Sequence, residues 1–183
     1  MSTLPKLSAI DYLSQERLSD TKHEFIAGEI FAMAGASAAH NLIVSNLIRE
    51  LGNQTKKRPC RVYPSDLRVQ VVDGYVYPDV TMVCGKPEFI EQDNLVNPSL
   101  IIEVLSPTTE DYDFGGKFAR YRQLESLQDY ILVAQDKVMV THYTRQDKNH
   151  WLLTEFTDRQ ATVSLSNLQC DLLLDDVYDK VFE

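Results

Sequence analysis

In the first third of the chain, the spacing of hydrophobic positions predicts a short helix, then a β-hairpin, then a long helix. Ser8, with Asp11 three residues later, predicts an N-cap and a short helix that runs to about Leu18. Two β-compatible runs, 23–26 and 29–33, flank a short glycine-bearing turn and predict a hairpin. Helical spacing over 39–57 predicts the first long helix, whose apolar stripe is Ile43, Val44, Leu47, Ile48 and Leu51.

The middle third reads as strands followed by a helix. Alternation over 67–71 predicts a half-exposed strand, and after the turn Asp73-Gly74 its partner should run over 75–84, broken by Pro78. Residues 100–105 are apolar on both faces, which is typical of a covered central strand. The turn 106–109 should then lead to a helix capped by Asp111 or Asp113, with the inner stripe Phe114, Lys117, Phe118, Tyr121, Leu124 and Leu127.

The last third predicts further strands at 130–134, 138–143, 151–157 and 162–165, mostly antiparallel because their connections are short. The fold class is therefore α/β (α+β), with a mixed central sheet flanked by helices, an N-terminal hairpin and antiparallel C-terminal strands. A length of 183 residues fits one domain spanning 1–183.

Charge and composition narrow the class of protein. The chain has 18 Lys and Arg against 27 Asp and Glu, a net charge of −9, which argues against a general nucleic-acid coat protein but leaves room for a local basic groove. The basic residues at 56–58 and Arg61 are read as a solvated helix end rather than a DNA clamp. No apolar stretch approaches the roughly 20 residues that cross a bilayer, and no leader is recognisable, so we expect a cytoplasmic protein without membrane association.

The cysteines do not indicate a metal site or a disulfide framework. Cys60, Cys84 and Cys170 are an odd number and lie far apart, outside any Cys/His zinc spacing. We therefore expect all three to be reduced thiols.

The candidate chemistry starts from Glu103, which lies inside the apolar strand. An unpaired carboxylate there would cost several kcal/mol, so it needs either a shared cation or a buried ammonium. Asp79 follows a proline where its strand leaves the ladder; if the two strands are neighbours, Asp79 and Glu103 could share one Mg²⁺ or Mn²⁺. Lys117, on the inner stripe of the next helix, could supply the ammonium.

These residues resemble a known family. Pro78-Asp79 followed by Glu103-Val104-Leu105 is similar to the PD-(D/E)XK nuclease superfamily, with Leu105 in place of the usual lysine. The order Pro78-Asp79-Val80, Ile102 to Pro107, Lys117 with Tyr121, and Tyr130 to Val133 resembles the Uma-two family of restriction endonuclease-like proteins, in which the lysine has moved to the following helix. The similarity spans nearly the whole chain, including Glu24, the Gly28-Glu29 hairpin and His40.

The resemblance implies divalent-metal-dependent hydrolysis of DNA phosphodiester bonds. It implies that Asp79, Glu103 and the carbonyl of Val104 hold Mg²⁺ or Mn²⁺, and that Lys117 orients a water or stabilises the transition state. His40 is a candidate ligand or proton carrier.

Further residues are carried at lower weight. Additional candidates for the site are Glu24, Glu29 and Tyr121, while Arg120 and Arg122 are candidates for holding DNA phosphates. Because cutting both strands of a duplex takes two sites, a twofold homodimer is expected.

Other interpretations remain open at this point. Glu103 and Lys117 could form a structural ion pair, His40 could be a hydrogen-bonded core histidine, and Tyr121 could serve packing alone. At the level of function, the alternatives are a non-catalytic nuclease-fold scaffold that binds DNA or protein, and a hydrolase of small phosphate esters.

Overall fold

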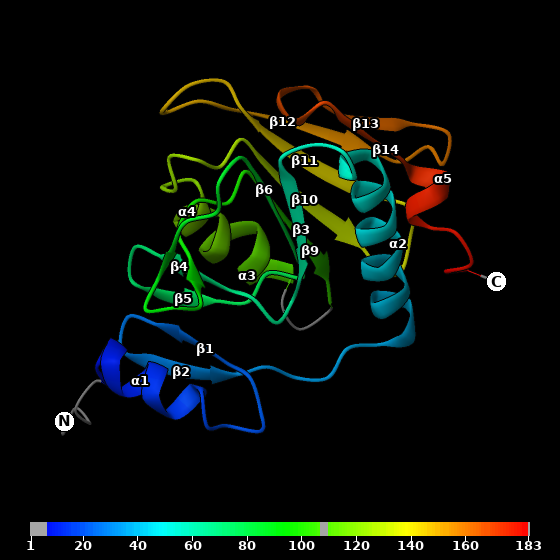
Figure 1. Cartoon of the computed structure of the whole chain (residues 1–183). Helices are drawn as coiled ribbons and strands as arrows, with labels where there is room; N and C mark the ends of the chain where they lie inside the picture. Colours follow the sequence, from blue (N-terminus) through cyan, green and yellow to red (C-terminus); the bar gives the residue numbers. More distant parts are fainter. Residues whose placement is uncertain (1–6, 107–109, 183) are drawn as a thin grey trace.

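Two six-stranded mixed sheets form the framework of the computed structural model, which describes residues 7–106 and 110–182 (Figure 1). The first sheet has the order β2-β1-β5-β4-β8-β7, with strands β1 (His23–Ile26), β2 (Glu29–Ala32), β4 (Arg68–Val71), β5 (Gly74–Val76), β7 (Phe89–Ile90) and β8 (Asn94–Leu95). The second has the order β12-β11-β10-β9-β6-β3, with strands β3 (Cys60–Pro64), β6 (Val80–Cys84), β9 (Leu100–Leu105), β10 (Asp129–Ala134), β11 (Val140–Arg145) and β12 (Trp151–Phe156). The predicted fold class is confirmed.

Helical segments and a terminal hairpin cover these sheets. The helices are α1 (Ala9–Glu16), α2 (Ala38–Thr55), α3 (Glu110–Tyr112), the π-helical turn η1 (Asp113–Lys117), α4 (Phe118–Tyr121), the 3₁₀ turn η2 (Ser166–Leu168) and α5 (Leu174–Val177). Strands β13 (Thr162–Leu165) and β14 (Cys170–Leu173) form a separate antiparallel hairpin. Of the turn expected at 106–109, residues 107–109 lie outside the described residues.

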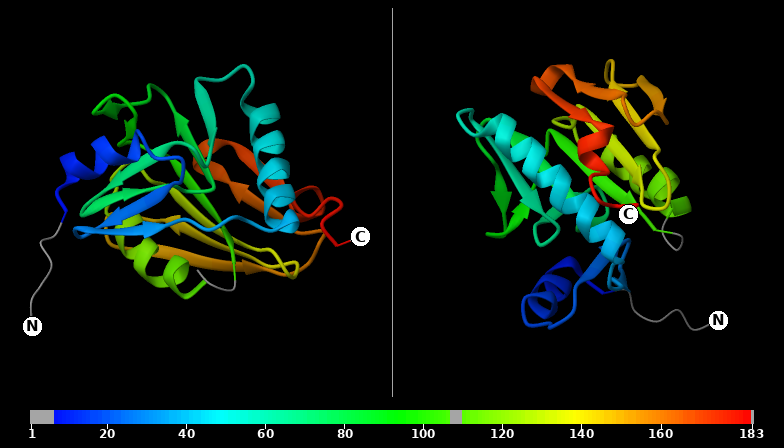
Figure 2. Two further views of the ribbon diagram at one scale, coloured as in Figure 1. Left: turned by 90° about the horizontal axis from the view of Figure 1, so that it is seen from below. Right: turned by 90° about the vertical axis from the view of Figure 1, so that its right-hand side faces the viewer.

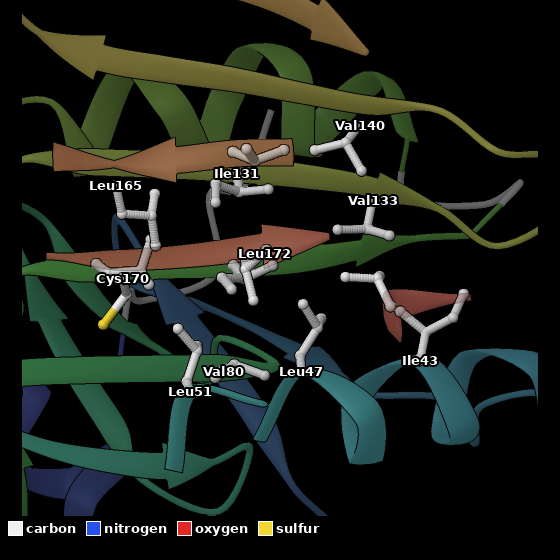
Figure 3. Close-up of a cluster of buried hydrophobic side chains, with 14 of the residues drawn as sticks. Ile43, Leu47, Leu51, Val80, Ile131, Val133, Val140, Leu165, Cys170 and Leu172 are labelled. Carbon is white, nitrogen blue, oxygen red and sulfur yellow. The ribbon is translucent and has the colours of Figure 1, made fainter. Parts of the chain in front are cut away.

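The central strands of the second sheet, β9 and β10, are buried on both faces. On one face, Ile131 and Val133 of β10 pack with Ile43, Leu47 and Leu51 of α2 and with residues of the β13–β14 hairpin and α5 (Figure 3). On the other, Ile101 and Leu105 of β9 pack with Tyr121 of α4 and with residues of the first sheet. Figure 2 shows α2 lying along one side of the molecule, with α1 and the β1–β2 hairpin at one end. Glu103 and Tyr121 of the candidate residues lie on the second of these faces.

The N-terminal predictions hold. Ser8 caps α1 by accepting a hydrogen bond from the backbone N–H of Asp11, although the helix ends at Glu16, two residues before Leu18. The β1–β2 hairpin is formed, and β1 also pairs with β5. A Cβ at Gly74 would lie 1.7 Å from the carbonyl oxygen of Phe25, so only glycine lets these two strands approach. This pairing places Glu24 beside the segment that carries Asp79.

Two predicted elements differ from the structure. The run 75–84 is not one strand: β5 stays in the first sheet, and after Tyr77-Pro78-Asp79 the chain crosses to β6 in the second sheet. The helix expected to run through Leu127 begins at Glu110, so neither Asp111 nor Asp113 caps it, and it ends at Tyr121. The guanidinium of Arg145 then binds the backbone carbonyls of residues 122, 124 and 127, which stabilises a non-helical path.

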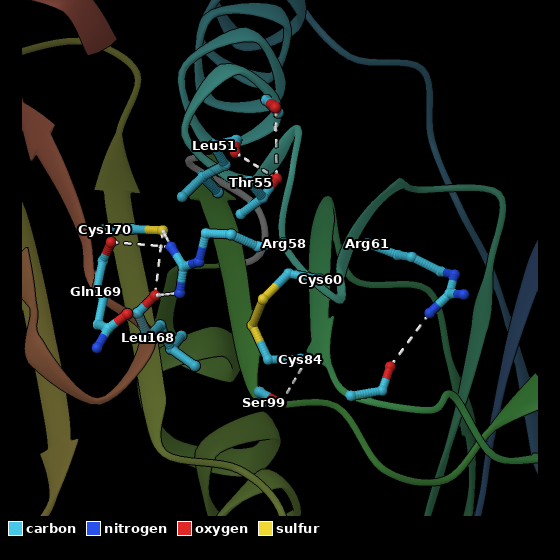
Figure 4. The surroundings of a disulfide bond; sticks show 12 residues. Leu51, Thr55, Arg58, Cys60, Arg61, Cys84, Ser99, Leu168, Gln169 and Cys170 are labelled. Atoms are coloured by element: carbon cyan, nitrogen blue, oxygen red, sulfur yellow. Dashed lines mark hydrogen bonds between the residues drawn. A yellow bond between two sulfur atoms is a disulfide. The ribbon is translucent and has the colours of Figure 1, made fainter.

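The expectation of three reduced cysteines is wrong for two of them. Cys60 and Cys84 form a disulfide, while Cys170 is a buried free thiol (Figure 4). Cys60 of β3 lies directly opposite Cys84 of β6 in the antiparallel register, which brings their Cα atoms to 4.0 Å. The two cysteines are 24 residues apart in the sequence, so their pairing becomes evident only from the strand register.

Among the described residues, no helix has both the length and the apolar character needed to span a membrane.

Candidate active site

Glu103 projects from the middle of β9 into the layer between the sheets. Side chains alternate along a strand, so Glu103 shares a face with Ile101 and Leu105, which belong to the core on that side. The strand pairs with β10 on one side and β6 on the other, and only 3% of Glu103 is exposed. A carboxylate held this deeply must be compensated by its immediate neighbours.

Lys117 supplies part of that compensation, and it meets three carboxylates. Its Nζ lies 3.1 Å from Glu103 Oε1, 3.2 Å from Asp113 Oδ1 and 3.4 Å from Glu24 Oε1. The hydroxyl of Tyr121 donates a second hydrogen bond to Glu103 Oε1 at 2.7 Å. One oxygen of Glu103 is thus engaged by two donors from the helical segment.

Asp79 lies on the other side of Glu103. Its backbone N–H donates to Glu103 Oε2 at 3.3 Å, and its own Oδ2 accepts from the backbone N–H of Val104 at 2.8 Å. His40, near the start of α2, places Nε2 3.2 Å from the same Oδ2. Asp79 and His40 keep 15% and 13% of their side chains exposed, so this edge of the site is the one that solvent reaches.

We refer to Glu24, Asp79, Glu103 and Asp113 around Lys117 as the carboxylate cluster. Its charges are unbalanced, because three carboxylates contact the Lys117 ammonium and a fourth, that of Asp79, lies beside Glu103. Burial raises the pKa of Glu103 to about 8; Lys117 opposes that rise, while Asp113, Asp79 and Glu24 add to it. Burial alone would lower the pKa of Lys117, but the carboxylates of Glu103, Glu24 and Asp113 outweigh it and raise that pKa well above its ordinary value. The ammonium therefore stays charged, while the cluster retains an affinity for further cations or protons.

The structure brings most of the sequence-predicted residues together, but not all. Glu29 is exposed at the first position of β2. The guanidinium of Arg120 binds both oxygens of Asp73, at 2.8 and 2.9 Å, and Arg122 is exposed after the end of α4. Residues 56–61 lie near the Cys60–Cys84 end of β3 and β6, whereas Asp79 adjoins the opposite end, where Pro64 pairs with Val80. Arg58 there binds the carbonyls of Leu168 and Gln169.

Asp113 is the site residue that sequence reasoning took for a helix cap. It is 2% exposed and pairs with Lys117 four residues later. The signal was the i,i+4 spacing of an acid and a base on a stripe otherwise made of apolar and aromatic residues.

The donor set fits a hard divalent cation that keeps part of its water shell. Glu103 Oε2 accepts from the backbone N–H of Asp79, whose own carboxylate lies at the solvent-facing edge, so two carboxylates are available; no group of three or more His, Cys, Asp and Glu side chains within 7–106 and 110–182 is placed to hold a metal ion. Mg²⁺ typically binds in this way, through one or two carboxylates, waters and phosphate oxygens.

The fold and the site together define a mixed α/β protein with a buried cluster of carboxylates around one lysine. The chain belongs to the Uma2 family, described as "Putative restriction endonuclease", whose model matches residues 10–175. Two uncharacterized Synechocystis proteins are similar to it: sll1609 is 38% identical over 91% of this chain and 96% of its own length, and slr1290 is 35% identical over 95% and 92%. The crystal structure of a "putative nuclease belonging to DUF820" from Anabaena variabilis has a TM-score of 0.70 at 19% identity, covering 89% of this chain and 93% of that one, so it shares the fold.

Proposed function

We propose that this protein is a divalent-metal-dependent endonuclease that hydrolyses DNA phosphodiester bonds. The observation that carries the proposal is that Asp79 and Lys117 both contact Glu103. The backbone N–H of Asp79 donates to Oε2, and the Lys117 ammonium lies beside Oε1. A structural ion pair between Glu103 and Lys117 would not require Asp79 on the other oxygen of Glu103, nor the surplus of carboxylates around them.

In this proposal Asp79, Glu103 and the backbone carbonyl of Val104 hold Mg²⁺ or Mn²⁺. Such an ion supplies an acidified water and neutralises charge on the scissile phosphate. Lys117 provides a fixed positive charge beside the reacting phosphate, because its neighbours keep it protonated. Tyr121, also held protonated by burial and by Glu103, keeps the Glu103 carboxylate in one orientation.

His40 has the role of a proton carrier at the solvent-facing edge. Its Nε2 contacts Asp79, and its Nδ1 is buried without a hydrogen-bond partner among the described residues. An imidazole that contacts a proposed metal-binding carboxylate through one nitrogen can relay a proton at that contact. Glu24 contributes negative charge that draws a cation into the cluster.

The test is a cleavage assay combined with Mn²⁺ titration by calorimetry. Supercoiled, linear duplex and single-stranded DNA are compared with nucleotides, for the wild type and for Asp79→Asn and Glu103→Gln. We expect Mg²⁺- or Mn²⁺-dependent DNA cleavage that falls by ~100-fold or more in both variants, as typically follows the loss of one transition-state stabilising group. Mn²⁺ binding should fall with it.

Matched controls are Asp136→Asn and Glu125→Gln, which make the same changes at exposed positions. They should cleave like the wild type. Cleavage of nucleotides alone would identify a small phosphoester hydrolase, and a wild type that binds DNA without binding Mn²⁺ would identify a scaffold. Cutting both strands takes two sites, so the proposed enzyme acts as a twofold homodimer; a monomer by light scattering at assay concentration would contradict that part.

A further inference from the structure

We infer that Asp113 is a positioning residue of the candidate active site, whose carboxylate holds the Lys117 ammonium against Glu103. The inference rests on the proposed function and adds to it a residue that acts through the lysine. The contact is an ion pair of 3.2 Å between Asp113 Oδ1 and Lys117 Nζ, with side chains 3% and 8% exposed; it is a charge contact without hydrogen-bond geometry, whereas Lys117 donates a hydrogen bond to Glu103. Ion pairs this deeply buried depend strongly on both partners.

The backbone between Asp113 and Lys117 forms a π-helical turn rather than a regular α-helix. Asp113 and Lys117 are the first and last residues of the π-helical turn η1, between the short α-helices α3 and α4. Single π-turns are rare and occur frequently at functional sites. The turn directs its two end side chains inward, while Gly115 between them is exposed.

Other contacts fix the backbone of this turn without using the Asp113 charge. The hydroxyl of Tyr130 donates to the backbone carbonyl of Asp113 at 3.0 Å. The Tyr112 ring lies over Lys117, with 5.8 Å between Nζ and the ring centroid, and a Cβ at Gly116 would come within 2.6 Å of that ring. A neutral side chain at 113 should therefore leave the turn in place and release only the lysine.

Lys117 needs such a partner because its side chain is flexible. The ammonium is carried on a four-carbon stem, and its other two carboxylates come from β9 and β1, which belong to different sheets. Asp113 belongs to the same turn as Lys117 and so keeps the same position relative to its backbone. The Asp113 carboxylate therefore restricts the positions that the Lys117 ammonium can take before substrate binds.

The experiment compares Asp113→Asn with Asp111→Asn, the same change at an exposed position two residues earlier. A displaced catalytic group costs ~100-fold when the misplacement reaches about 1 Å. We therefore expect kcat for DNA cleavage to fall by ~10- to 100-fold in Asp113→Asn, with KM and the Mn²⁺ Kd within about twofold of wild type. Asp111→Asn should match the wild type. A folded Asp113→Asn protein with unchanged kcat would overturn the inference, as would a parallel loss of Mn²⁺ affinity, which would make Asp113 a ligand.

A second readout does not depend on activity. The side-chain ¹⁵N signal of Lys117 is assigned by its absence in Lys117→Arg. Its Nζ-bound protons should exchange slowly with water in the wild type and in Asp111→Asn. In Asp113→Asn this exchange should be faster and the signal should broaden. A wild type that cleaves no phosphodiester would refute the proposed function and leave this readout to decide on Asp113. Asp113→Glu keeps the charge and should retain the signal; a folded Asp113→Glu protein with wild-type kcat but without that signal would also overturn the inference.

Discussion

Two buried polar clusters lie on either side of the Tyr77-Pro78-Asp79 segment, and they are compensated in different ways. The first, the N-terminal network, comprises Glu16, His23, Arg68, Tyr77 and Asp93. Glu16 Oε1 accepts from the Tyr77 hydroxyl at 2.9 Å and from the His23 backbone N–H at 2.8 Å, and Oε2 lies 3.0 Å from His23 Nδ1. Arg68 donates to Asn94, to the Tyr77 hydroxyl and to Asp93.

The N-terminal network is closed, with charges of both signs and donors matched to acceptors. Burial raises the pKa of Tyr77 to about 12, with hydrogen bonding to Arg68 lowering it and to Glu16 raising it, so the hydroxyl stays protonated and bridges the two. The carboxylate cluster is open by contrast, because three acids contact one ammonium, Asp79 adds a fourth acid beside Glu103, and the pKa of Glu103 rises to about 8.

Burial of charge therefore does not by itself indicate a functional site. A balanced network is explained by stability alone, because each group has its partner. An excess of one sign lowers stability and is expected where a ligand of the opposite sign completes the site.

The largest effect is expected from Lys117→Met. The change leaves Glu24, Glu103 and Asp113 without their shared ammonium, and removing one partner of a buried pair typically costs about 3–5 kcal/mol. Urea unfolding of the metal-free protein at pH 7 measures this loss. DNA cleavage should disappear as well.

The control is Lys22→Met, which removes a lysine paired with Asp66 at the surface. Exposed pairs contribute about 0–1 kcal/mol, so this variant should unfold close to the wild type. A Lys117→Met protein as stable as Lys22→Met would mean that the carboxylates are neutral without the lysine, and the charge-excess interpretation would fail.

An intermediate effect is expected from Tyr77→Phe. The change removes the hydroxyl between Arg68 and Glu16 and leaves each with one fewer partner, at a cost of about 1–3 kcal/mol. The free energy of unfolding should fall while Mn²⁺ affinity and cleavage stay within about twofold of wild type, since the network is closed. Loss of Mn²⁺ binding in a folded Tyr77→Phe protein would show that the two clusters are coupled through the 77–79 segment.

The two clusters also differ in how far the sequence predicts them. Glu103 was found because one acid interrupts a short apolar strand, and α2 because its stripe is periodic; both are local signals. Asp79 stands out by the proline before it and Lys117 by its place on the inner stripe of the next helix, and the family resemblance joins both to Glu103. The N-terminal network gave no such signal, since its members are far apart in sequence and each is of ordinary type for a surface.

Local sequence patterns do not predict the strand register, nor the contacts between distant residues that depend on it. The run 75–84 suits one strand interrupted at Pro78, yet β5 and β6 on either side of the interruption belong to different sheets. The Cys60–Cys84 disulfide and the Arg120–Asp73 pair depend on contacts across 24 and 47 residues. Asp113 looked like a helix cap because the π-turn that aims it at Lys117 has no recognisable period.

The smallest effect is expected from Asp93→Asn, at the exposed end of the N-terminal network. Partial burial pushes the pKa of Asp93 up, but hydrogen bonds from Arg17 and Arg68 outweigh it and leave the pKa below its ordinary value. A carboxylate with a lowered pKa in the folded state stabilises above its unfolded pKa, and that contribution is lost as the pH falls through the folded pKa.

The stability difference between wild type and Asp93→Asn should therefore be below about 1 kcal/mol at pH 6, shrink further in high salt, and decline as the pH falls through the lowered pKa of the folded-state carboxyl. Urea unfolding over a series of pH values from 6 downwards measures it, with Asp20→Asn as the exposed control. A difference that does not change over that pH series would assign the effect to packing. The N-terminal network would then be stabilised at this end by side-chain packing rather than by paired charges.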